Sequence, residues 1–365
     1  MRGNERQTLN GICPYFTMFP LDFPLGILKR QARKGDLVLD PFCGRGTTNF
    51  AARLVGLNSL GVDSSPVATA ITASKLVKAS VNDILEEAHK ILMGYEARQI
   101  PAGKFWRHAF HPDVLDPLCR FREAFLEDCT IAPRVALRGI VLGALHGPKQ
   151  KTFPSYFSNQ CPRTYAPKPA YATRYWRSRK LAPDPINVLS VIERRARRYY
   201  ENSFDITGTV RLADSRFAEA LRPETPKTRF NWVITSPPYY GVQSYIPDQW
   251  LRNWLVGGPD TVDYSHRGQV AHSSPEDFAA DLKQVWHNVW RVCADSARMV
   301  IRFGGIACKH VSPLDLIKKS LYGSGWRIMT IKQAGSAIVG KRQADTFLRT
   351  KTKSKIEYDI WAIRC

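Results

Sequence analysis

A serine, two prolines and a tyrosine follow one another at the end of an apolar segment of the chain. The stretch NWVITSPPYYG, residues 231–241, begins as a buried strand and breaks at Ser236, Pro237, Pro238 and Tyr239. Proline has no backbone N–H and a fixed φ, so the Pro237 carbonyl can point outward without a competing local donor. A hydroxyl, an outward carbonyl and an aromatic ring can together hold a flat substrate that carries hydrogen-bond donors. Such a turn could do chemistry, or it could merely end a strand, and the rest of the chain must decide between the two.

A second segment that could do chemistry is the glycine-containing loop DPFCGRGTT, residues 40–48. It follows the apolar run LVL, which is typical of a buried parallel strand, and precedes the helical segment NFAARLVG. Gly44 and Gly46 allow a tight turn and a close approach to a ligand, while Thr47 and Thr48 can cap the helix. A strand, a glycine turn and a helix N-terminus together form a nucleotide pocket. The spacing does not match the dinucleotide fingerprint, and it excludes an NTPase P-loop.

An acidic side chain ends the next apolar stretch, LNSLGVD. This residue, Asp63, lies 17 positions beyond Gly46 and just before the helical segment SPVATAITASKL. An acid at the tip of the second strand is where a nucleotide-binding fold grips the ribose hydroxyls. On its own Asp63 indicates a helix cap, and beside the glycine loop it predicts ribose binding; the two roles can coexist.

The charge and composition of the chain narrow the classes of partner. The 365 residues carry a formal net charge of +21, which favours nucleic acid as a partner over an anionic membrane surface. The chain has no apolar run of 18 residues and no signal-peptide core, so we expect a cytoplasmic protein that contacts no membrane. The eight cysteines lack C-x-x-C pairs and zinc-ligand spacing, so we expect no bound metal.

The loop, the acidic residue and the proline turn together resemble the amino-group DNA methyltransferases. DPFCGRGTT resembles the cofactor loop of that family, D-P-F-x-G-x-G-T-T, and TSPPYYG resembles its catalytic motif, [DNS]-P-P-[YFW]. The resemblance implies S-adenosyl-L-methionine as cofactor and an α/β, Rossmann-like class I methyltransferase fold, with a mostly parallel seven-stranded sheet and an antiparallel strand near the C-terminus. The catalytic residues that it implies are Ser236, Pro237, Pro238 and Tyr239. The cofactor-binding residues that it implies are Phe19, Asp40, Pro41, Phe42, Gly44, Gly46, Thr47, Thr48, Asp63 and Asp214.

The resemblance also implies a mechanism and a target base. These enzymes methylate an exocyclic base nitrogen, so Ser236 and the Pro237 carbonyl would accept the two amine protons while Tyr239 stacks on a base flipped out of the duplex. Serine at the first motif position is the usual form in cytosine-N4 enzymes, and aspartate or asparagine is the usual form in adenine-N6 enzymes. We therefore expect direct methyl transfer to cytosine N4 in double-stranded DNA, with adenine N6 as the nearest alternative.

Two alternatives from other functional classes stay open. An RNA or tRNA guanine-N2 methyltransferase has a similar cofactor loop, but it usually carries aspartate where Ser236 stands. A non-catalytic DNA-binding module with a decayed methyltransferase fold is the other, although the intact glycine loop and SPPY motif argue against decay. For cellular context, the resemblance implies a nucleoid-associated prokaryotic enzyme, with a cognate restriction endonuclease as a candidate partner.

The elements that must position these residues indicate a catalytic domain split by an insertion. We predict residues 1–79 and 206–365 as its two parts, and residues 80–205 as an insertion between the second and third strands. The third strand is GTVRLADSRF, which ends near Asp214 and is followed by a short helix, FAEALRP. Near the C-terminus, ARMVIRFGG, WRIMTIKQ and EYDIWAIRC indicate strands, the last two antiparallel. Within the insertion, helical spacing occurs in VNDILEEAHKILMGYEAR, PDVLDPLCRFREAFLED, PRVALRGIVLGALHG and INVLSVIERRARRYYENSF.

The insertion carries about half of the excess charge. Residues 148–198 contain 12 basic and 2 acidic side chains, a net charge of +10. The proline- and aromatic-rich part, residues 148–185, has little periodicity and indicates a loop. Cations neutralise phosphates and rings stack on bases, so we predict DNA contact here; the alternative is a solvated basic loop packed by its own aromatics. The DNA-binding residues that we predict are Arg163, Lys168, Arg174, Tyr175, Arg177, Arg179 and Lys180.

Overall fold

A computed structural model describes residues 8–15, 19–147, 154–159, 168–201, 208–225, 227–241, 245–262, 274–304, 311–336 and 356–365. The chain divides into two units, each built from three stretches of sequence. Unit 1 comprises Met1–Phe16, Ala73–Asp205 and Ser244–Ser265. Unit 2 comprises Thr17–Thr72, Ile206–Gln243 and His266–Cys365. One junction between the units thus follows residue 205, where the sequence predicts the insertion to end, but unit 1 also takes in residues 1–16, 73–79 and 244–265, which lie outside the predicted insertion.

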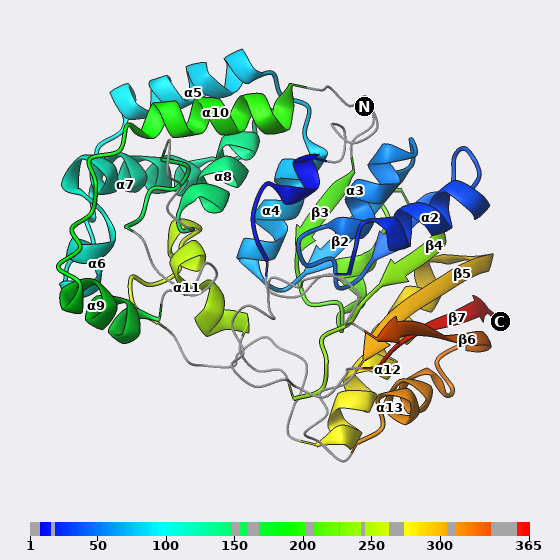
Figure 1. Cartoon of the computed structure of the whole chain (residues 1–365). Helices are drawn as coiled ribbons and strands as arrows, with labels where there is room; N and C mark the ends of the chain where they lie inside the picture. The colour runs from blue at the N-terminus through cyan, green and yellow to red at the C-terminus, as the bar shows by residue number, and fades with distance from the viewer. Residues whose placement is uncertain are drawn as a thin grey trace. The chain divides into compact units, whose positions relative to one another are not determined.

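Unit 2 is built around a seven-stranded sheet (Figure 1) with the strand order β3-β2-β1-β4-β5-β7-β6. The strands are β1 (Leu37–Asp40), β2 (Asn58–Asp63), β3 (Thr209–Leu212), β4 (Phe230–Thr235), β5 (Cys293–Gly304), β6 (Trp326–Ser336) and β7 (Ile356–Arg364). Strands β1 to β5 are parallel, and β7 lies between β5 and β6 and is antiparallel to both. This topology confirms the predicted Rossmann-like class I methyltransferase fold.

Apolar side chains on both faces of the sheet hold helices against it. Adjacent residues of a strand point to opposite faces. Accordingly Val38 and Ile234 pack into one core with α2 and α3, while Leu39 and Val233 pack into a second core with α12 and α13. A parallel sheet that is covered on both faces needs such continuous apolar strands. The helices are α2 (Asp22–Gln31), α3 (Thr47–Leu54), α12 (Pro275–Val292) and α13 (Pro313–Leu321).

Unit 1 is helical in the residues that the structure describes, and helix α4 (Pro66–Leu76) runs into it from unit 2. Helix α5 packs beside α10 and α8, and α6 packs beside α9 (Figure 1). The four helices predicted in the insertion are confirmed as α5, α7, α8 and α10. The elements of unit 1 are η1 (Thr8–Gly11), α5 (Val81–Gly94), α6 (Lys104–Ala109), α7 (Pro112–Glu127), α8 (Ala132–Ala144), α9 (Pro169–Ser178), α10 (Val188–Tyr200) and α11 (Tyr245–Leu255).

Two local predictions are wrong. The predicted loop 148–185 contains helix α9, which begins with Pro169 in its first turn and buries only Ala172 and Trp176. Two inward residues over ten positions are too few to give the sequence a visible helical period. The predicted helix after β3 is a single 3₁₀ turn, η2 (Ala218–Leu221).

Helix length and hydropathy also bear on membrane contact. Among the helices that the structure describes, none combines the length and the apolar character needed to cross a membrane.

Candidate active site

The glycine loop after β1 depends on two residues with left-handed backbone. Gly44 has φ of 51° and Gly46 has φ of 73°, a region that other residues rarely adopt. The Gly46 N–H donates to the Cys43 carbonyl at 2.7 Å, which closes the turn. A Cβ atom on Gly46 would lie 2.6 Å from the side chain of Thr72. Both the backbone conformation and the available space therefore require glycine at position 46.

The two threonines after the loop do not cap α3, contrary to the prediction. Gly46 occupies the N-cap position, and no side chain caps the helix. Thr48 Oγ1 instead donates to the Ile234 carbonyl in β4 at 3.0 Å. The N–H groups of the first turn of α3 consequently face the loop without a side-chain cap, which favours a polar or anionic ligand group there.

Asp63, at the end of β2, holds the loop from the other side. Its Oδ2 accepts the Gly44 N–H at 2.9 Å, and its Oδ1 accepts the Ser65 N–H at 2.9 Å. The carboxylate therefore fixes the glycine loop and the chain that leads into α4 at the same time. Each carboxylate oxygen has two lone pairs, so these bonds leave acceptor capacity for further donors, and ribose binding stays a prediction.

Two side-chain bonds tie the glycine loop to the end of β4. Thr235 Oγ1 donates to Asp40 Oδ1 at 2.6 Å, and the second bond is that of Thr48 to Ile234. Asp40 Oδ1 also accepts the Phe42 N–H at 3.1 Å. Because Thr235 immediately precedes Ser236, these bonds fix the start of the SPPY turn relative to the glycine loop.

The acids of this edge are held in an environment that disfavours their charge. Asp40 is 1% exposed, and its buried Oδ2 has no hydrogen-bond partner among the residues that the structure describes. Burial raises the pKa of Asp40 to about 6, although the bonds from Thr235 and Phe42 and the nearby Thr48 hydroxyl lower it, and the nearby Asp63 charge raises it further. Burial also raises the pKa of Asp63. Asp40, which is buried, and Asp63, which is partly exposed, both have a raised pKa and favour a ligand that brings positive charge.

The SPPY turn follows β4, and contacts with β5 and β7 hold its Tyr239 in place. Pro237 is buried, whereas Ser236, Pro238 and Tyr239 are partly exposed. The Tyr239 hydroxyl donates to Glu357 Oε1 of β7 at 3.1 Å, and its ring meets Phe303 edge to face, with centroids 5.5 Å apart. The turn thus presents a hydroxyl, a proline pair and an oriented ring at the carboxyl edge of the sheet.

Helix α12 supports three of the loops at this edge. Its Trp286 meets the Phe42 ring of the glycine loop edge to face at 5.9 Å, and its Phe278 meets Tyr240 in the same way at 5.5 Å. The Nδ2 of Asn288 donates to the carbonyls of Ser215, at 3.2 Å, and Arg216, at 2.8 Å. One helix therefore positions the chain after β1, β3 and β4.

Asp214 lies after β3, but its carboxylate is paired. Arg216 donates to both oxygens of Asp214, at 2.6 to 3.1 Å, and also to Asp281 Oδ2 at 2.9 Å. Burial raises the pKa of Asp214, and the bonds from Arg216 outweigh this, so that the net shift is downward. The neighbouring Ser215 Oγ donates to the Pro41 carbonyl at 2.7 Å, which joins this loop to the glycine loop. A contact between Asp214 and a cofactor stays a prediction.

The predicted cofactor and catalytic residues gather at one sheet edge because they follow β1, β2, β3 and β4, which are parallel. Phe19 is the exception: it precedes α2, and its ring meets Phe23 edge to face at 5.4 Å. Sequence reasoning missed Thr235, Thr72, Trp286 and Glu357. Thr235 adjoins the recognised motif and could have been included, but no local pattern marks the other three.

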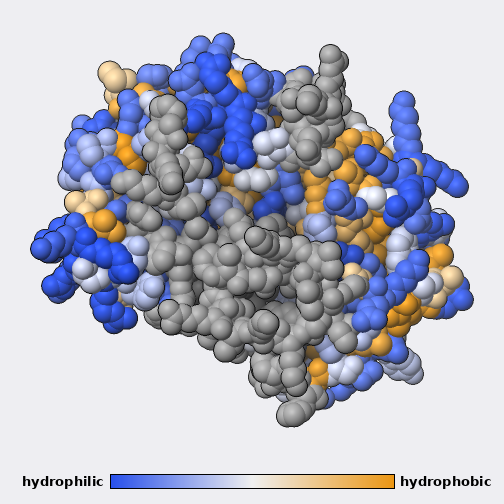
Figure 2. All heavy atoms as spheres, in the orientation of Figure 1, coloured by the Kyte–Doolittle hydropathy of each residue, from blue (hydrophilic) through white to orange (hydrophobic). Residues whose placement is uncertain are grey.

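Most of the predicted DNA-binding residues lie on α9 or directly beside it, in unit 1. The inner side of α9 packs Trp176 against Phe105, with centroids 5.6 Å apart. Its outer side is exposed and carries no acidic residue. Figure 2 shows hydrophilic side chains over this part of unit 1. The predicted residues that the structure describes are Lys168, Arg174, Tyr175, Arg177, Arg179 and Lys180, whereas Arg163 lies outside the described ranges.

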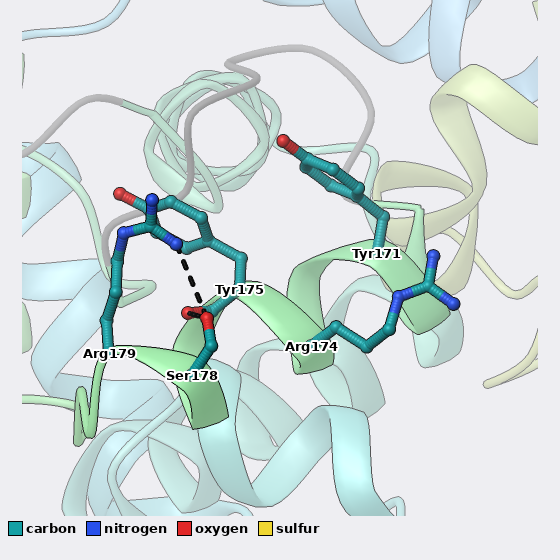
Figure 3. Close-up of a pocket in the computed structure, with 5 residues that line it drawn as sticks. All are labelled: Tyr171, Arg174, Tyr175, Ser178 and Arg179. Carbon is teal, nitrogen blue, oxygen red and sulfur yellow. Dashed lines mark hydrogen bonds between the residues drawn. The ribbon is translucent and has the colours of Figure 1, made fainter.

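The outer side of α9 forms a shallow groove of about 480 Å³. The rings of Tyr171 and Tyr175 rise on the same side of the helix (Figure 3). The Arg179 guanidinium lies over the Tyr175 ring, 4.1 Å from its centroid, and donates to Ser178 Oγ at 3.4 Å. Arg174 completes the lining. The groove therefore combines cations with flat rings.

Comparison with known proteins concerns mainly the first part of the chain. Residues 1–74, which include the glycine loop and Asp63, match the family model described as DNA methylase, the N6/N4 methyltransferases. This first part of the chain is therefore similar to the amino-group DNA methyltransferases. Two curated proteins are similar to part of the chain: the Type II methyltransferase M.MjaII of Methanocaldococcus jannaschii, 37% identical over 76 residues, and the Type II methyltransferase M.BsoBI of Geobacillus stearothermophilus, 33% identical over 67 residues.

These matches are short relative to both chains. They cover 21% and 18% of this chain, and only 14% and 13% of the two relatives. Among solved structures, the rRNA methyltransferase aviRa of Streptomyces viridochromogenes aligns over 100% of this chain and 93% of its own, at 12% identity and a TM-score of 0.36. TrmN of Thermus thermophilus aligns over 95% of this chain and 49% of its own, at 9% identity and a TM-score of 0.36.

Proposed function

We propose that this protein transfers a methyl group from S-adenosyl-L-methionine to an exocyclic amine of a base in double-stranded DNA, with cytosine N4 as the target. The observation that carries the proposal is the pair of bonds between the glycine loop and the end of β4, Asp40 to Thr235 and Thr48 to Ile234. They hold a nucleotide-type pocket and an amine-accepting turn against each other. Methyl transfer needs this proximity, since the donor and the acceptor must meet in line.

The residues of the pocket fit the proposed cofactor. S-adenosyl-L-methionine carries a sulfonium and an ammonium group, and it supplies an electrophilic methyl. The buried Asp40 Oδ2 has no partner in the described part of the chain, so it can accept a hydrogen bond from a cationic donor. Asp63 would accept the ribose hydroxyls while it holds Gly44. A phosphate-rich ligand would instead bring negative charge beside these two carboxylates.

The SPPY turn supplies what an exocyclic amine needs to become a nucleophile. The amine lone pair is delocalised into the base ring. The Ser236 hydroxyl and the Pro237 carbonyl would each accept one amine hydrogen, which turns the lone pair toward the methyl donor. Tyr239 would stack on the base, which must leave the duplex to reach the turn. No covalent intermediate with the protein is required.

Ser236 supports cytosine N4 as the target, because serine at this position is the form that the cytosine-N4 members of the family usually carry. The same geometry can orient the amine of adenine, so adenine N6 is the second candidate. Ser236 also disfavours an RNA or tRNA guanine-N2 activity, because enzymes with that activity usually carry aspartate at this position. A cognate restriction endonuclease is a further proposal; a gene for a nuclease of the same site specificity beside this one would support it.

The groove on α9 supports DNA as the substrate. Three of its five lining residues, Arg174, Tyr175 and Arg179, were predicted to contact DNA from charge and aromatic content, and no carboxylate lies on the helix to repel phosphate. Arginines neutralise phosphates, and a tyrosine covered by a guanidinium offers a stacking surface for a base. We propose that α9 is a DNA contact of unit 1.

Incubation with cofactor labelled in its methyl group tests the function. Duplex DNA and bulk tRNA are offered separately, and the hydrolysed products are separated by chromatography. We expect label in N4-methylcytosine from DNA. Label only in N6-methyladenine would overturn the choice of base, and label only in tRNA would overturn the choice of substrate. The Ser236→Ala variant is the control for a contaminating activity.

A further inference from the structure

The hydroxyl of Tyr239 is bound by a residue 118 positions later in the chain. Glu357 Oε1 accepts it at 3.1 Å. Glu357 stands near the start of β7, where it pairs in register with Gly304, the last residue of β5. Because β7 is antiparallel to β5, the start of β7 lies at the carboxyl edge of the parallel strands. The antiparallel strand thereby delivers a carboxylate to the SPPY turn.

Two contacts fix the ring of Tyr239. The Phe303 ring, 1% exposed on β5, meets it edge to face at an interplanar angle of 80°. Glu357 holds the far end of the same side chain. A tyrosine has two side-chain torsions, and contacts at the ring and at the hydroxyl together restrict both. The Tyr239 side chain stays partly exposed.

We propose that Glu357 is a positioning residue for the target base, which acts by holding the Tyr239 ring in the orientation that stacks on the extruded base. The inference rests on the proposed function. A ring that is oriented in advance does not lose rotational freedom when the base arrives, so more of the stacking free energy is available to hold the base. Without Glu357 the ring would turn about its torsions, and the amine would meet the methyl donor in line less often.

Three variants separate this role from a purely structural tie between β4 and β7. Glu357→Ala removes the acceptor, Glu357→Gln keeps an oxygen that can accept the hydroxyl, and Tyr239→Phe removes the donor. We expect kcat to fall about tenfold in Glu357→Ala and in Tyr239→Phe, with Glu357→Gln near wild type. The double variant Tyr239→Phe with Glu357→Ala should be no slower than either single one, because both remove the same bond. The Kd for S-adenosyl-L-methionine should not change.

Base extrusion is read separately with a fluorescent base analogue at the methylated position, once sequencing has mapped it. Glu357→Ala should lower the fluorescence gain on binding, and Glu357→Gln should restore it. The matched control is Asp295→Ala, because Asp295 of β5 pairs with Arg364 at the opposite end of β7 and so ties the same two strands. It should leave both readouts unchanged.

The outcomes distinguish this inference from the proposed function. If the wild type methylates DNA and Glu357→Ala matches it in kcat and fluorescence, Glu357 has no positioning role. Equal losses in Glu357→Ala and Asp295→Ala would mean that only sheet stability is involved. If Glu357→Ala does not fold, an unchanged Tyr239→Phe variant would still overturn the inference. A wild type that methylates no DNA would count against the proposed function itself.

Discussion

The buried carboxylate of Asp40 should make the protein less stable and, at the same time, enable it to bind its cofactor. Asp40→Asn keeps the shape of the side chain and the Oδ1 acceptor for Thr235 and Phe42, but removes the charge. We expect the variant to be more stable than the wild type in the absence of ligand, and to bind S-adenosyl-L-methionine more weakly. A substitution that raises the free energy of unfolding and lowers the affinity for the cofactor would indicate that the charge serves ligand binding at the expense of stability.

The pKa of Asp40 gives the size of the effect. Burial raises it from 3.8 to about 6, a shift of roughly 2 units at ~1.4 kcal/mol each, or about 3 kcal/mol. Between pH 3.8 and 6 the folded protein binds more protons than the unfolded chain, so the free energy of unfolding falls as the pH rises. Above pH 6 the whole cost is present. The amide that replaces Oδ2 brings buried donors of its own, so we expect a net gain of ~1–3 kcal/mol at pH 8 and little difference near pH 4.

Urea unfolding followed by tryptophan fluorescence, at pH 4.5 and pH 8, measures the stability, and calorimetry measures cofactor binding. Thr235→Val is the companion variant: its lost hydrogen bond should raise the pKa of Asp40 further and move the fall in stability to higher pH. If Asp40→Asn is less stable than the wild type by the same amount at both pH values, the ionised carboxylate does not destabilise the folded protein. If it binds the cofactor as tightly as the wild type, Oδ2 does not meet a cation.

The other predictions concern the turn, the loop and α9. Ser236→Ala should lower kcat about tenfold or more with an unchanged cofactor Kd, because only an amine acceptor is lost; a weaker Kd would mean that its role is misassigned. Gly46→Ala should destabilise the fold by ~2 kcal/mol or more in thermal unfolding, whereas Gly35→Ala, with φ of 91° but open space, should cost less. Changing Arg174, Arg177 and Arg179 to glutamine should reduce the slope of log Kd for DNA against log salt concentration by about 3. An unchanged slope would mean that α9 does not contact DNA.

The fold and the main site segments could be predicted because their signals are local. Each of the strands that end at Asp40 and Asp63 is a short apolar run with an acid at its tip, and the SPPY turn is a run of four residues. Once these segments follow parallel strands, the fold brings them to one edge without any further information. The helices α5, α7, α8 and α10 were visible because their apolar residues recur over three turns or more.

Other features escaped prediction because they depend on contacts between distant segments. The bond of Thr48 to the Ile234 carbonyl joins positions 186 residues apart, so the sequence suggested a helix cap instead. Glu357 becomes part of the site only through the antiparallel insertion of β7. Helix α9 escaped because it buries just two side chains and owes its place to the contact of Trp176 with Phe105.

The charges at the carboxyl edge of the sheet indicate which kind of ligand binds there, which the glycine loop alone does not determine. A strand, a glycine turn and a helix N-terminus suit a phosphate as well as an uncharged or zwitterionic ligand group. Asp40 and Asp63 remove that ambiguity, because burial raises the pKa of both and a phosphate beside them would raise the cost further. A cationic ligand lowers that cost. The hydrogen bond from Thr235 then links the acid that we propose meets the cofactor to the turn that we propose meets the base. On this reasoning we expect a bound cofactor to stabilise the ionised form of Asp40 and to strengthen its bond to Thr235, which would rigidify the turn before the base arrives.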